Sequence, residues 1–516
     1  MNTLRPAVLA LTGLVLLSNG GTAAPPTVTF PPAESPPPPP AKTPPKTQAG
    51  GEETDILIAP GPTMRKTQHR TPPPPTNLTV MYKVEYGRQL QYKHPDGTVQ
   101  VFDQWKSYEN DAFNLVKLAN ERLRDGNNYQ YATKPLASKE GFDPVDIPIL
   151  YMTGDYDFVL TSAEVENLRR FLLGGGTIIF NAARGRDEFS KAVARELRKV
   201  FPQKPLMRLP LDHPIFNAYY RITDVTMMVN GVRSTQPPEV YSIDVGTRAA
   251  AILLPGGLGT ALSDTAYHPG GKHIVGEKAK RLGVNLVAYM LGSTEYGKFL
   301  AQDFPVYNGT TRGGDVFRYA QVRYSGSWDV NPAVQNSLLA GVKENTKIDV
   351  DFTPHAVALD DAEMGHFPLV FMTGHYNFTL TDKEGAGLAL YLRRGGLLVA
   401  TSAGGLKPFG RAFRRELKKA LPEGKWIKLP PTHPLFAGGW NAIDMVAYTP
   451  AALKDDNALE YPEFYGCFLG DRLVALYSPY DLMSGINRES NAYAKGLLPD
   501  DALRVGINIV TFALSN

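Results

Sequence analysis

Residues 368–378 read PLVFMTGHYNF, and residues 148–158 read PILYMTGDYDF. The two stretches are offset by 220 residues, which is the distance from Gly154 to Gly374. Each is an apolar run followed by a polar turn that contains glycine, a pattern typical of a buried strand that ends in a tight loop. The chain therefore contains two copies of one strand and turn.

The similarity between the copies extends well beyond this strand. Residues 148–216 and 368–436 align without a gap at about two identities in five. In both copies a Thr-x-x-Glu sequence, beginning at Thr161 or Thr381, predicts a capping box at the start of a helix. Glycines then predict the helix end, and another apolar strand follows. This alternation predicts an α/β fold with two tandem doubly wound parallel sheets, each covered by helices on both faces.

The chain of 516 residues is too long for one hydrophobic core, and its composition divides it further. We expect a signal peptide at 1–24, a proline-rich disordered linker at 25–76, a first repeat at 77–300 and a second repeat at 315–516. Arg5, the apolar run 7–17 and the small residues 20–24 follow the layout of a secretory signal. We therefore expect export to the periplasm or cell envelope of a bacterium, with retention of this segment as an anchor as the alternative.

Each repeat is expected to contain several further elements. In the first repeat, after an irregular opening, we expect a hairpin turn at 94–97, helices at 105–123, 189–200 and 283–291, and strands at 146–152, 177–180 and 249–254. In the second repeat we expect strands at 317–324, 367–372 and 397–400, a hairpin at 464–478, and helices at 331–343, 409–421 and 503–514.

Charge and cysteine content limit the functional classes. The formal net charge is +3, which gives no electrostatic reason to expect nucleic acid or an anionic membrane as a partner. Cys467 is the only cysteine, so no internal disulfide can form. No stretch beyond the N-terminal signal approaches the roughly 20 apolar residues of a membrane helix. The expected partner is a small ligand or an envelope protein.

The second repeat resembles a known family through several motifs. They are RY at 323–324, Trp328, TGHYNF at 373–378, REL at 415–417, HPLF at 433–436, YSPYDL at 477–482 with Gly485, and GINIV at 506–510. Together they resemble the bacterial domain-of-unknown-function family 4159 over nearly all of 315–516. This resemblance implies a fold similar to class I glutamine amidotransferases, with a flavodoxin-like sheet, and it implies no activity.

The first repeat resembles the same family less fully. It keeps MTG at 152–154, HP at 213–214 and GVN at 283–285. It has Asp155 where the second repeat has His375, and LPGGLG at 254–259 where the second repeat has YSPYDL. These differences place any site shared with the family in the second repeat.

Amidotransferase chemistry requires a cysteine on the sharp turn after a central strand, with a histidine beside it. The corresponding residues 401–405 read TSAGG, and their counterparts 181–185 read NAARG. The missing nucleophile favours a non-catalytic binding protein. The alternative is a hydrolase that uses Ser402 as nucleophile and His433 as base, although a histidine before proline is also typical of a structural turn.

No cofactor or metal ion is expected. The glycine clusters end helices, whereas phosphate-binding loops precede a helix. The chain also contains no closely spaced pair of metal ligands.

Ligands of doubly wound sheets bind beyond the carboxyl ends of the strands. The candidate ligand-binding residues there are Thr373, Gly374, His375, Asn377, Tyr480 and Asp481. Two alternatives are that His375 is exposed or bonded locally and that Asp481 caps the next turn. The first copy has aspartates at the positions of His375 and Asn377, so the second copy is the better candidate for function. A third possibility is that the first repeat only supports, or dimerises with, the second.

Overall fold

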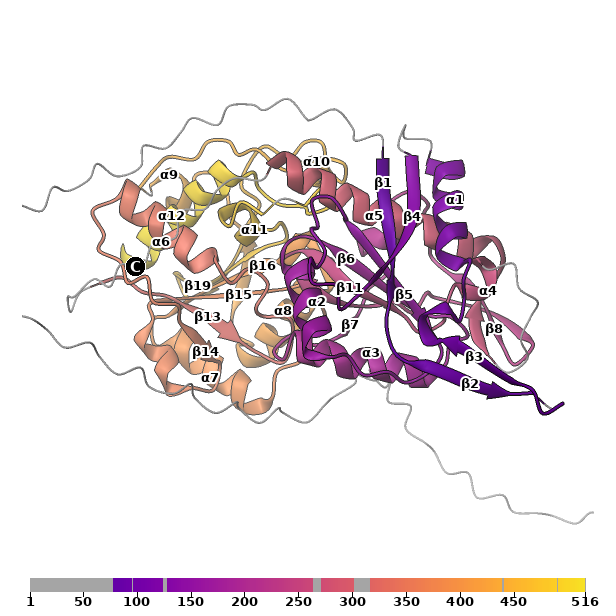
Figure 1. Ribbon diagram of the computed structural model, residues 1–516. Coiled ribbons are helices and arrows are strands. Elements are labelled where there is room, and N and C mark those ends of the chain that lie inside the picture. Colours follow the sequence, from indigo (N-terminus) through magenta and orange to yellow (C-terminus); the bar gives the residue numbers. More distant parts are fainter. Residues whose placement is uncertain are drawn as a thin grey trace, which may run out of the picture. The chain divides into compact units, whose positions relative to one another are not determined.

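The computed structural model describes residues 78–94, 96–123, 128–262, 271–300, 316–438, 440–489 and 491–515 (Figure 1). The expected signal peptide and proline-rich linker lie outside these residues. Each repeat contains a seven-stranded sheet with helices on both faces. The predicted tandem α/β architecture is therefore confirmed.

The first sheet has the strand order β4-β1-β5-β6-β11-β10-β7. Its strands are β1 (Leu78–Glu85), β4 (Asn128–Pro135), β5 (Ile149–Gly154), β6 (Thr177–Ala182), β7 (Met207–Arg208), β10 (Tyr241–Val245) and β11 (Arg248–Leu254). The first five in spatial order run parallel, whereas β10 is antiparallel to both β11 and β7. The sheet is thus mixed rather than purely parallel, because β10 and β11 form a hairpin.

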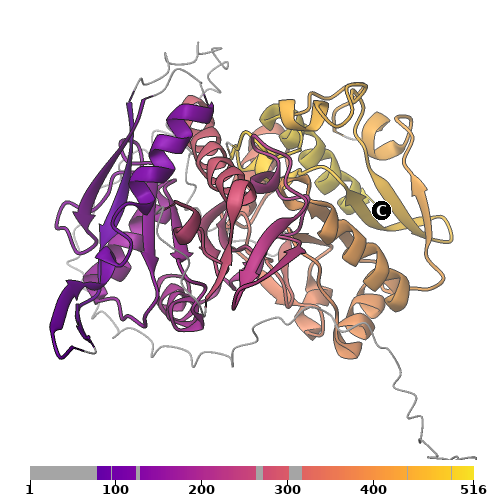
Figure 2. The same cartoon turned by 90° about the vertical axis from the view of Figure 1, so that its right-hand side faces the viewer.

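Helices cover both faces of this first sheet. They are α1 (Asp111–Leu123), α2 (Ser162–Leu173), α3 (Asp187–Val200), α4 (Gly259–Leu262) and α5 (Gly276–Leu300). Helices α1 and α5 lie side by side and share one hydrophobic core (Figure 2), while α2 and α3 share the core on the opposite face.

Smaller elements flank the first sheet. They are the hairpin β2 (Gln89–Lys93) and β3 (Val99–Asp103), the strands β8 (Val225–Val229), β9 (Val232–Gln236) and β12 (Lys272–Ile274), and the 3-10 turns η1 (Gln104–Lys106) and η2 (Pro214–Phe216). The hairpin confirms the predicted turn at 94–97. The helix predicted from residue 105 begins only at Asp111.

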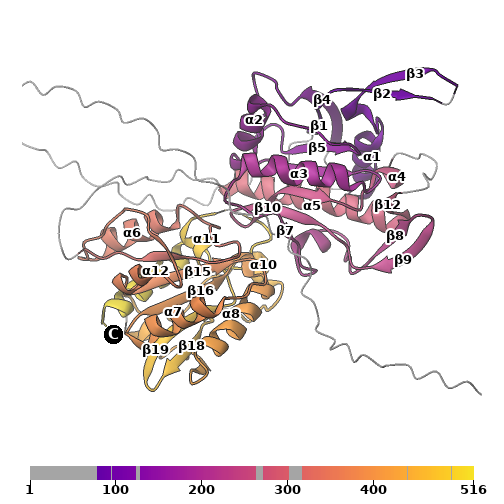
Figure 3. The ribbon, with the colours of Figure 1, turned by 90° about the horizontal axis from the view of Figure 1, so that it is seen from below.

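The second sheet repeats the same order as β14-β13-β15-β16-β19-β18-β17. Its strands are β13 (Ala320–Arg323), β14 (Ala356–Ala358), β15 (Leu369–Gly374), β16 (Leu397–Ser402), β17 (Lys425–Lys428), β18 (Tyr465–Leu469) and β19 (Arg472–Ser478). Its helices and 3-10 turns are α6 (Val334–Asn345), η3 (Ala362–His366), α7 (Asp382–Arg393), η4 (Ala403–Gly405), α8 (Lys407–Ala420), α9 (Pro434–Ala437), α10 (Pro450–Leu453), α11 (Met483–Ile486) and α12 (Pro499–Ser515). Figure 3 shows α6 and α12 on one face of this sheet and α7 and α8 on the other.

Both predicted capping boxes are present. The backbone N–H of Thr161 donates to Glu164 at 2.7 Å, and that of Thr381 donates to Glu384 at 2.8 Å. In each box the glutamate N–H donates to the threonine hydroxyl at 3.3 Å. Because these bonds satisfy amides that a helix start leaves free, they fix where α2 and α7 begin.

Alternation along the central strands decides where their last residues point. Phe371 of β15 packs in the core beneath α6 and α12, whereas Ala400 of β16 packs in the core beneath α7 and α8. Side chains two residues apart on a strand share a face. Thr373 therefore faces the α6 and α12 side, and Ser402 faces the α7 and α8 side.

Candidate ligand-binding site

The second repeat contains a cleft of about 190 Å³. It is lined by Gln321, Trp328, Asp329, Asn331, Pro332, Val334, Gln335, Pro354, His355, Ala356 and Thr373. The chain passes from β13 through α6 to β14 on one side, and then to β15 on the other side of β13. This reversal is the topological switch point at which doubly wound sheets bind ligands. We call this space the crossover cleft.

Two polar atoms of the crossover cleft are buried without a hydrogen-bond partner. They are Oγ1 of Thr373 and Oδ1 of Asn331, on residues that are 1% and 4% exposed. A buried polar group without a partner costs about 1–3 kcal/mol. Such groups beside a cleft are typical of a site that a ligand or ordered water completes.

The first repeat fills the equivalent position with its own side chains. Lys83 pairs with Tyr151 in the sheet as Gln321 pairs with Phe371, so Lys83 and Gln321 occupy matching positions. Lys83 Nζ donates to Asp111 Oδ1 at 2.9 Å, and the Tyr151 hydroxyl donates to Asp111 Oδ2 at 2.8 Å. All three side chains are fully buried. An ion pair thus occupies the first crossover.

The polar side chains of the two central strands are also hydrogen-bonded to one another in the first repeat and not in the second. In the first repeat, Asn181 Nδ2 donates to the Tyr151 hydroxyl at 2.7 Å, and Thr153 Oγ1 donates to the Asn181 carbonyl at 3.2 Å. In the second repeat, Phe371 and Thr401 replace Tyr151 and Asn181. The hydroxyl of Thr401, like that of Thr373, has no partner. The first network is internally satisfied, whereas the second is open.

The first repeat contributes to the edge of the crossover cleft. Lys204 Nζ donates to the Asp329 carbonyl at 2.6 Å. Asn331 Nδ2 donates to the carboxylate of Glu489, which also accepts from the Thr247 hydroxyl at 2.9 Å. Burial raises the pKa of Glu489 to about 7, although hydrogen bonds from Thr247 oppose this rise. One carboxylate therefore connects the cleft with the first repeat.

His375 does not line the crossover cleft but lies at the contact between the repeats. It is 2% exposed, and its Nδ1 is 3.5 Å from Oδ2 of Asp244 in the first repeat. Neither ring nitrogen has a hydrogen-bond partner. Burial lowers the pKa of His375, and Asp244 opposes this shift. The neighbouring Tyr376 hydroxyl donates to Asp244, so this turn fastens one repeat to the other.

The counterpart of His375 bonds within its own repeat. Asp155 is fully buried and accepts from Arg184 Nε at 2.7 Å and from the Tyr108 hydroxyl at 3.2 Å. At this position the first repeat therefore has an aspartate in an internal ion pair, whereas the second repeat has a histidine at the contact between the repeats.

Gly374 and Asn377 hold the turn after β15 in place. A Cβ at Gly374 would lie 2.0 Å from the Tyr324 hydroxyl, so close packing requires glycine there. Asn377 is exposed and accepts from Arg415 at 3.0 Å. In this structure neither residue faces the crossover cleft.

Tyr480 and Asp481 also have partners within the second repeat. Asp481 is 1% exposed and accepts from the N–H groups of Gly404 and Ser484 at 2.6 and 2.9 Å. This geometry corresponds to the capping alternative, and burial raises the pKa of Asp481. The Tyr480 ring packs edge-on against Tyr448 at 5.1 Å.

Ser402 and His433 are not brought together. Ser402 Oγ lies 3.0 Å from the Tyr477 hydroxyl, on the α7 and α8 side of the sheet. His433 Nδ1 accepts from the Leu435 N–H at 3.2 Å, and its ring lies 5.7 Å from that of Phe512 in α12. The two side chains therefore lie on opposite faces of the sheet, and the geometry gives no support to a nucleophile and base pair.

Sequence reasoning found Thr373 but missed most of the residues that line the crossover cleft. Gln321, Asn331 and Gln335 were assigned only to a strand and a helix. Trp328 was noted only as part of the family resemblance. The sequence signal was limited to two amides, Asn331 and Gln335, at the start of the helix that follows the first strand. That both amides are buried beside the point where the strand order reverses is visible only in the structure.

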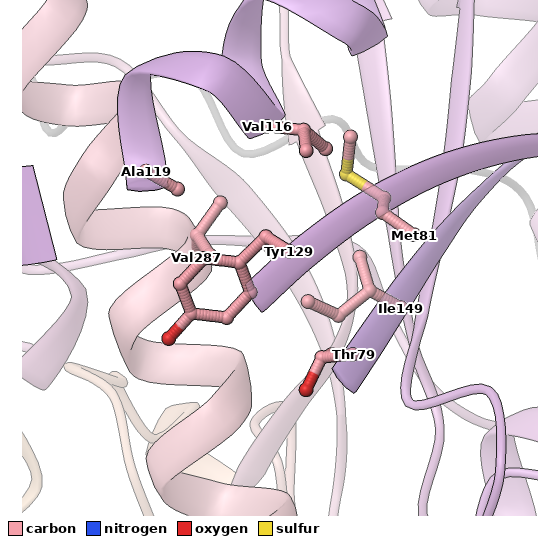
Figure 4. Close-up of a pocket in the computed structure, with 7 residues that line it drawn as sticks. All are labelled: Thr79, Met81, Val116, Ala119, Tyr129, Ile149 and Val287. Carbon is pink, nitrogen blue, oxygen red and sulfur yellow. The ribbon is translucent and has the colours of Figure 1, made fainter. Parts of the chain in front are cut away.

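Two other possibilities for a site find no support in the described residues. Figure 4 shows a crevice in the first repeat lined by Thr79, Met81, Val116, Ala119, Tyr129, Ile149 and Val287. Its volume of about 10 Å³ holds at most one water molecule. Within the described ranges, no three His, Cys, Asp or Glu side chains cluster as a metal site would require. None of the described helices is long and apolar enough to span a membrane.

The fold and the crossover cleft define a class of protein, a tandem α/β chain with one open and one filled crossover. The chain belongs to the family described as a domain of unknown function (DUF4159), whose model matches residues 89–291 and 318–514. Membership, expected from the resemblance, is confirmed for both repeats. The likeness to class I glutamine amidotransferases and the closer match of the second repeat remain predictions. No curated protein matches the chain.

Proposed function

We propose that this protein is an exported binding protein of the bacterial envelope and that the crossover cleft of its second repeat holds a small polar ligand. The observation that carries this proposal is the pair of unpartnered buried atoms, Thr373 Oγ1 and Asn331 Oδ1, beside an open cleft. A ligand that hydrogen-bonds to both atoms recovers the free energy that their burial costs.

The difference between the repeats supports a binding role. The first repeat has the same strand order, but the Lys83 and Asp111 ion pair occupies its crossover. In the proposed function the first repeat supports the second, and ligand exchange takes place only in the second.

Two further parts of the proposal rest on the sequence. The N-terminal pattern of Arg5, the apolar run 7–17 and small residues supports export. The turn 401–405, which contains no cysteine, supports a binding role without amidotransferase chemistry. Cell fractionation of the full chain, beside a chain that lacks residues 1–24, tests export. A full chain that remains in the cytoplasm contradicts it.

A blocking substitution tests the binding site. Ala356 lies at the edge of the crossover cleft, and Ala356→Trp should fill it. A thermal-shift screen of small neutral, cationic and anionic compounds should give stabilising ligands for the wild type, because a ligand at 100 times its Kd stabilises by about 2.7 kcal/mol. Ala356→Trp should abolish these shifts.

The first repeat provides the matched control. Thr133 pairs with Lys83 in β4 as Ala356 pairs with Gln321 in β14. Thr133→Trp should leave every ligand-induced shift intact. Shifts that persist in Ala356→Trp would place the binding site elsewhere and overturn the proposal.

A further inference from the structure

We propose that the ligand of the crossover cleft is a neutral, hydroxyl-rich ring, that is, a monosaccharide or another cyclic polyol. This inference rests on the proposed function and specifies its ligand. Four properties of the cleft support it, namely its size, its apolar lining, its free hydrogen-bonding atoms and its paired charges.

The size of the cleft limits the ligand to about one ring. A cavity of about 150 Å³ accommodates benzene, and sites for drug-sized ligands begin at about 300 Å³. The crossover cleft, at about 190 Å³, lies between these limits. A single six-membered ring fits, whereas an extended peptide or a dinucleotide does not.

Apolar groups line part of the cleft. Trp328 is partly exposed, and Pro332 and Pro354 lie beside the same space. The Trp328 carbonyl accepts from Gln321 Nε2 at 3.3 Å, and its N–H donates to the Gly326 carbonyl at 3.0 Å, so its backbone is held. A large rigid aromatic surface loses little entropy on binding, and the C–H face of a sugar ring is apolar enough to pack on it.

The free polar atoms match hydroxyl groups. Asn331 Nδ2 donates to the Glu489 carboxylate, which fixes the amide so that Oδ1 remains as an acceptor. The Thr373 hydroxyl can both donate and accept. Hydroxyl groups likewise do both, so one can donate to Asn331 while another bonds to Thr373. Gln335 is already occupied, because its amide bonds to the backbone of His355 at 2.6 and 2.8 Å.

The chargeable side chains that line the cleft are paired. Of the lining residues, Asp329 and His355 are those whose side chains can be charged. The Oδ2 atom of Asp329 lies 3.9 Å from Lys204 Nζ, and Nε2 of His355 lies 3.5 Å from Oδ2 of Asp351. Neither residue leaves a strong uncompensated charge. The cleft therefore suits a neutral ligand better than an ammonium ion or a phosphate, whose charge would be buried without a partner.

Titration calorimetry on the full chain tests this inference. The polyol probes are D-glucose, N-acetyl-D-glucosamine and myo-inositol, and the charged probes are benzylamine and inorganic phosphate. At least one polyol should bind, and Thr373→Val, which keeps the side-chain shape and removes the hydroxyl, should weaken it about tenfold. Trp328→Leu should also weaken it, and saturating polyol should change the tryptophan fluorescence of the wild type.

Thr401→Val provides the control, because it removes a similar unpartnered hydroxyl that does not line the cleft. Its affinity for the polyol should stay within about twofold of the wild type. Charged probes that bind in a Thr373-dependent manner, without polyol binding, would overturn the ligand class and leave the proposed function standing. Polyol binding unchanged by both Thr373→Val and Ala356→Trp would count against the inference and the proposed function together. Failure of all three polyols to bind overturns the inference.

Discussion

At the scale of one residue, the carboxylate of Glu489 joins the first repeat to the crossover cleft. It accepts from the Thr247 hydroxyl of the first repeat and from Asn331 at the cleft. Arg248 and Asp481 act on it electrostatically in opposite directions. Burial dominates and raises its pKa from 4.5 to about 7, so the folded chain binds a proton there that the unfolded chain releases at lower pH.

This shift predicts a pH dependence of stability. Because the folded pKa is raised, the contribution of Glu489 is fully present below pH 4.5 and is lost as the pH rises through about 7. The loss amounts to at most about 3 kcal/mol. Glu489→Gln should therefore flatten the decline in the free energy of unfolding between pH 5 and about pH 8, as measured by urea denaturation.

The exposed Glu460 provides the comparison. Glu460→Gln should leave the wild-type slope unchanged. A Glu489→Gln protein that kept the full pH slope would show that another group controls it.

At the scale of elements, the two capping boxes have nearly the same hydrogen-bond lengths. The Thr161 and Thr381 hydroxyls each accept from a backbone N–H that would otherwise lack a partner. Their contributions to stability should therefore be similar, even though α2 and α7 belong to different repeats.

Removal of either cap should destabilise the protein by about 1 kcal/mol. Thr161→Ala and Thr381→Ala should each show this loss in urea denaturation, and Thr→Ser at the same position should recover most of it. A loss in Thr→Ser as large as that in Thr→Ala would mean that packing of the methyl group, rather than the cap, stabilises the helix start.

These elements also show how far the sequence could predict the fold. Caps, helix-ending glycines and buried central strands were predicted because their signals lie within a few neighbouring residues. The sequence predicts an irregular segment where β1 lies, because the eight residues of this strand, LTVMYKVE, include a lysine that is buried only through its pairing with Asp111. Strand β10 lacked a clear signal because its place in the sheet depends on antiparallel pairing with β11 and β7, which lie elsewhere in the sequence or across a turn.

The site was less predictable than the fold. Thr373 lies at the carboxyl end of a central strand, so the general rule for doubly wound sheets located it. Asn331 could not be assigned in this way, because its importance depends on β13 lying beside β15 and on an amide oxygen that lacks a partner. His375 was placed at a rim, whereas contact with Asp244 from the other repeat buries it.

At the scale of the whole molecule, several contacts join the repeats. Tyr376 donates to Asp244, and Glu489 and Asn491 both bond to Thr247. In addition, the Tyr493 hydroxyl donates to a backbone carbonyl of α5 at 3.0 Å. Although each repeat has its own core on both faces of its sheet, burial of the Tyr376 ring depends on the other repeat.

Separation of the repeats should therefore weaken the second without unfolding it. The fragment 315–516 should fold, but it should melt several degrees below the full chain, because exposure of one aromatic ring costs about 2 kcal/mol. Circular dichroism melting curves measure this difference. An unfolded fragment would contradict the prediction and favour a purely supporting role for the first repeat.

Tyr376→Ser sharpens this comparison. It should lower the melting temperature of the full chain, where the ring is 5% exposed, and change that of the fragment little. Equal losses in both proteins would show that the ring is stabilised from within the second repeat.

The filled crossover of the first repeat bears on how the two copies can diverge further. Loss of either Lys83 or Asp111 alone leaves a buried charge unpaired, which destabilises a protein by about 3–5 kcal/mol. Replacement of both residues by apolar ones often leaves the stability unchanged. A cost of this size approaches the whole stability of many proteins. A lineage that changes one codon at a time must therefore pass through a strongly destabilised protein before it can reopen this crossover. The asymmetry between the copies is hard to reverse once it has formed.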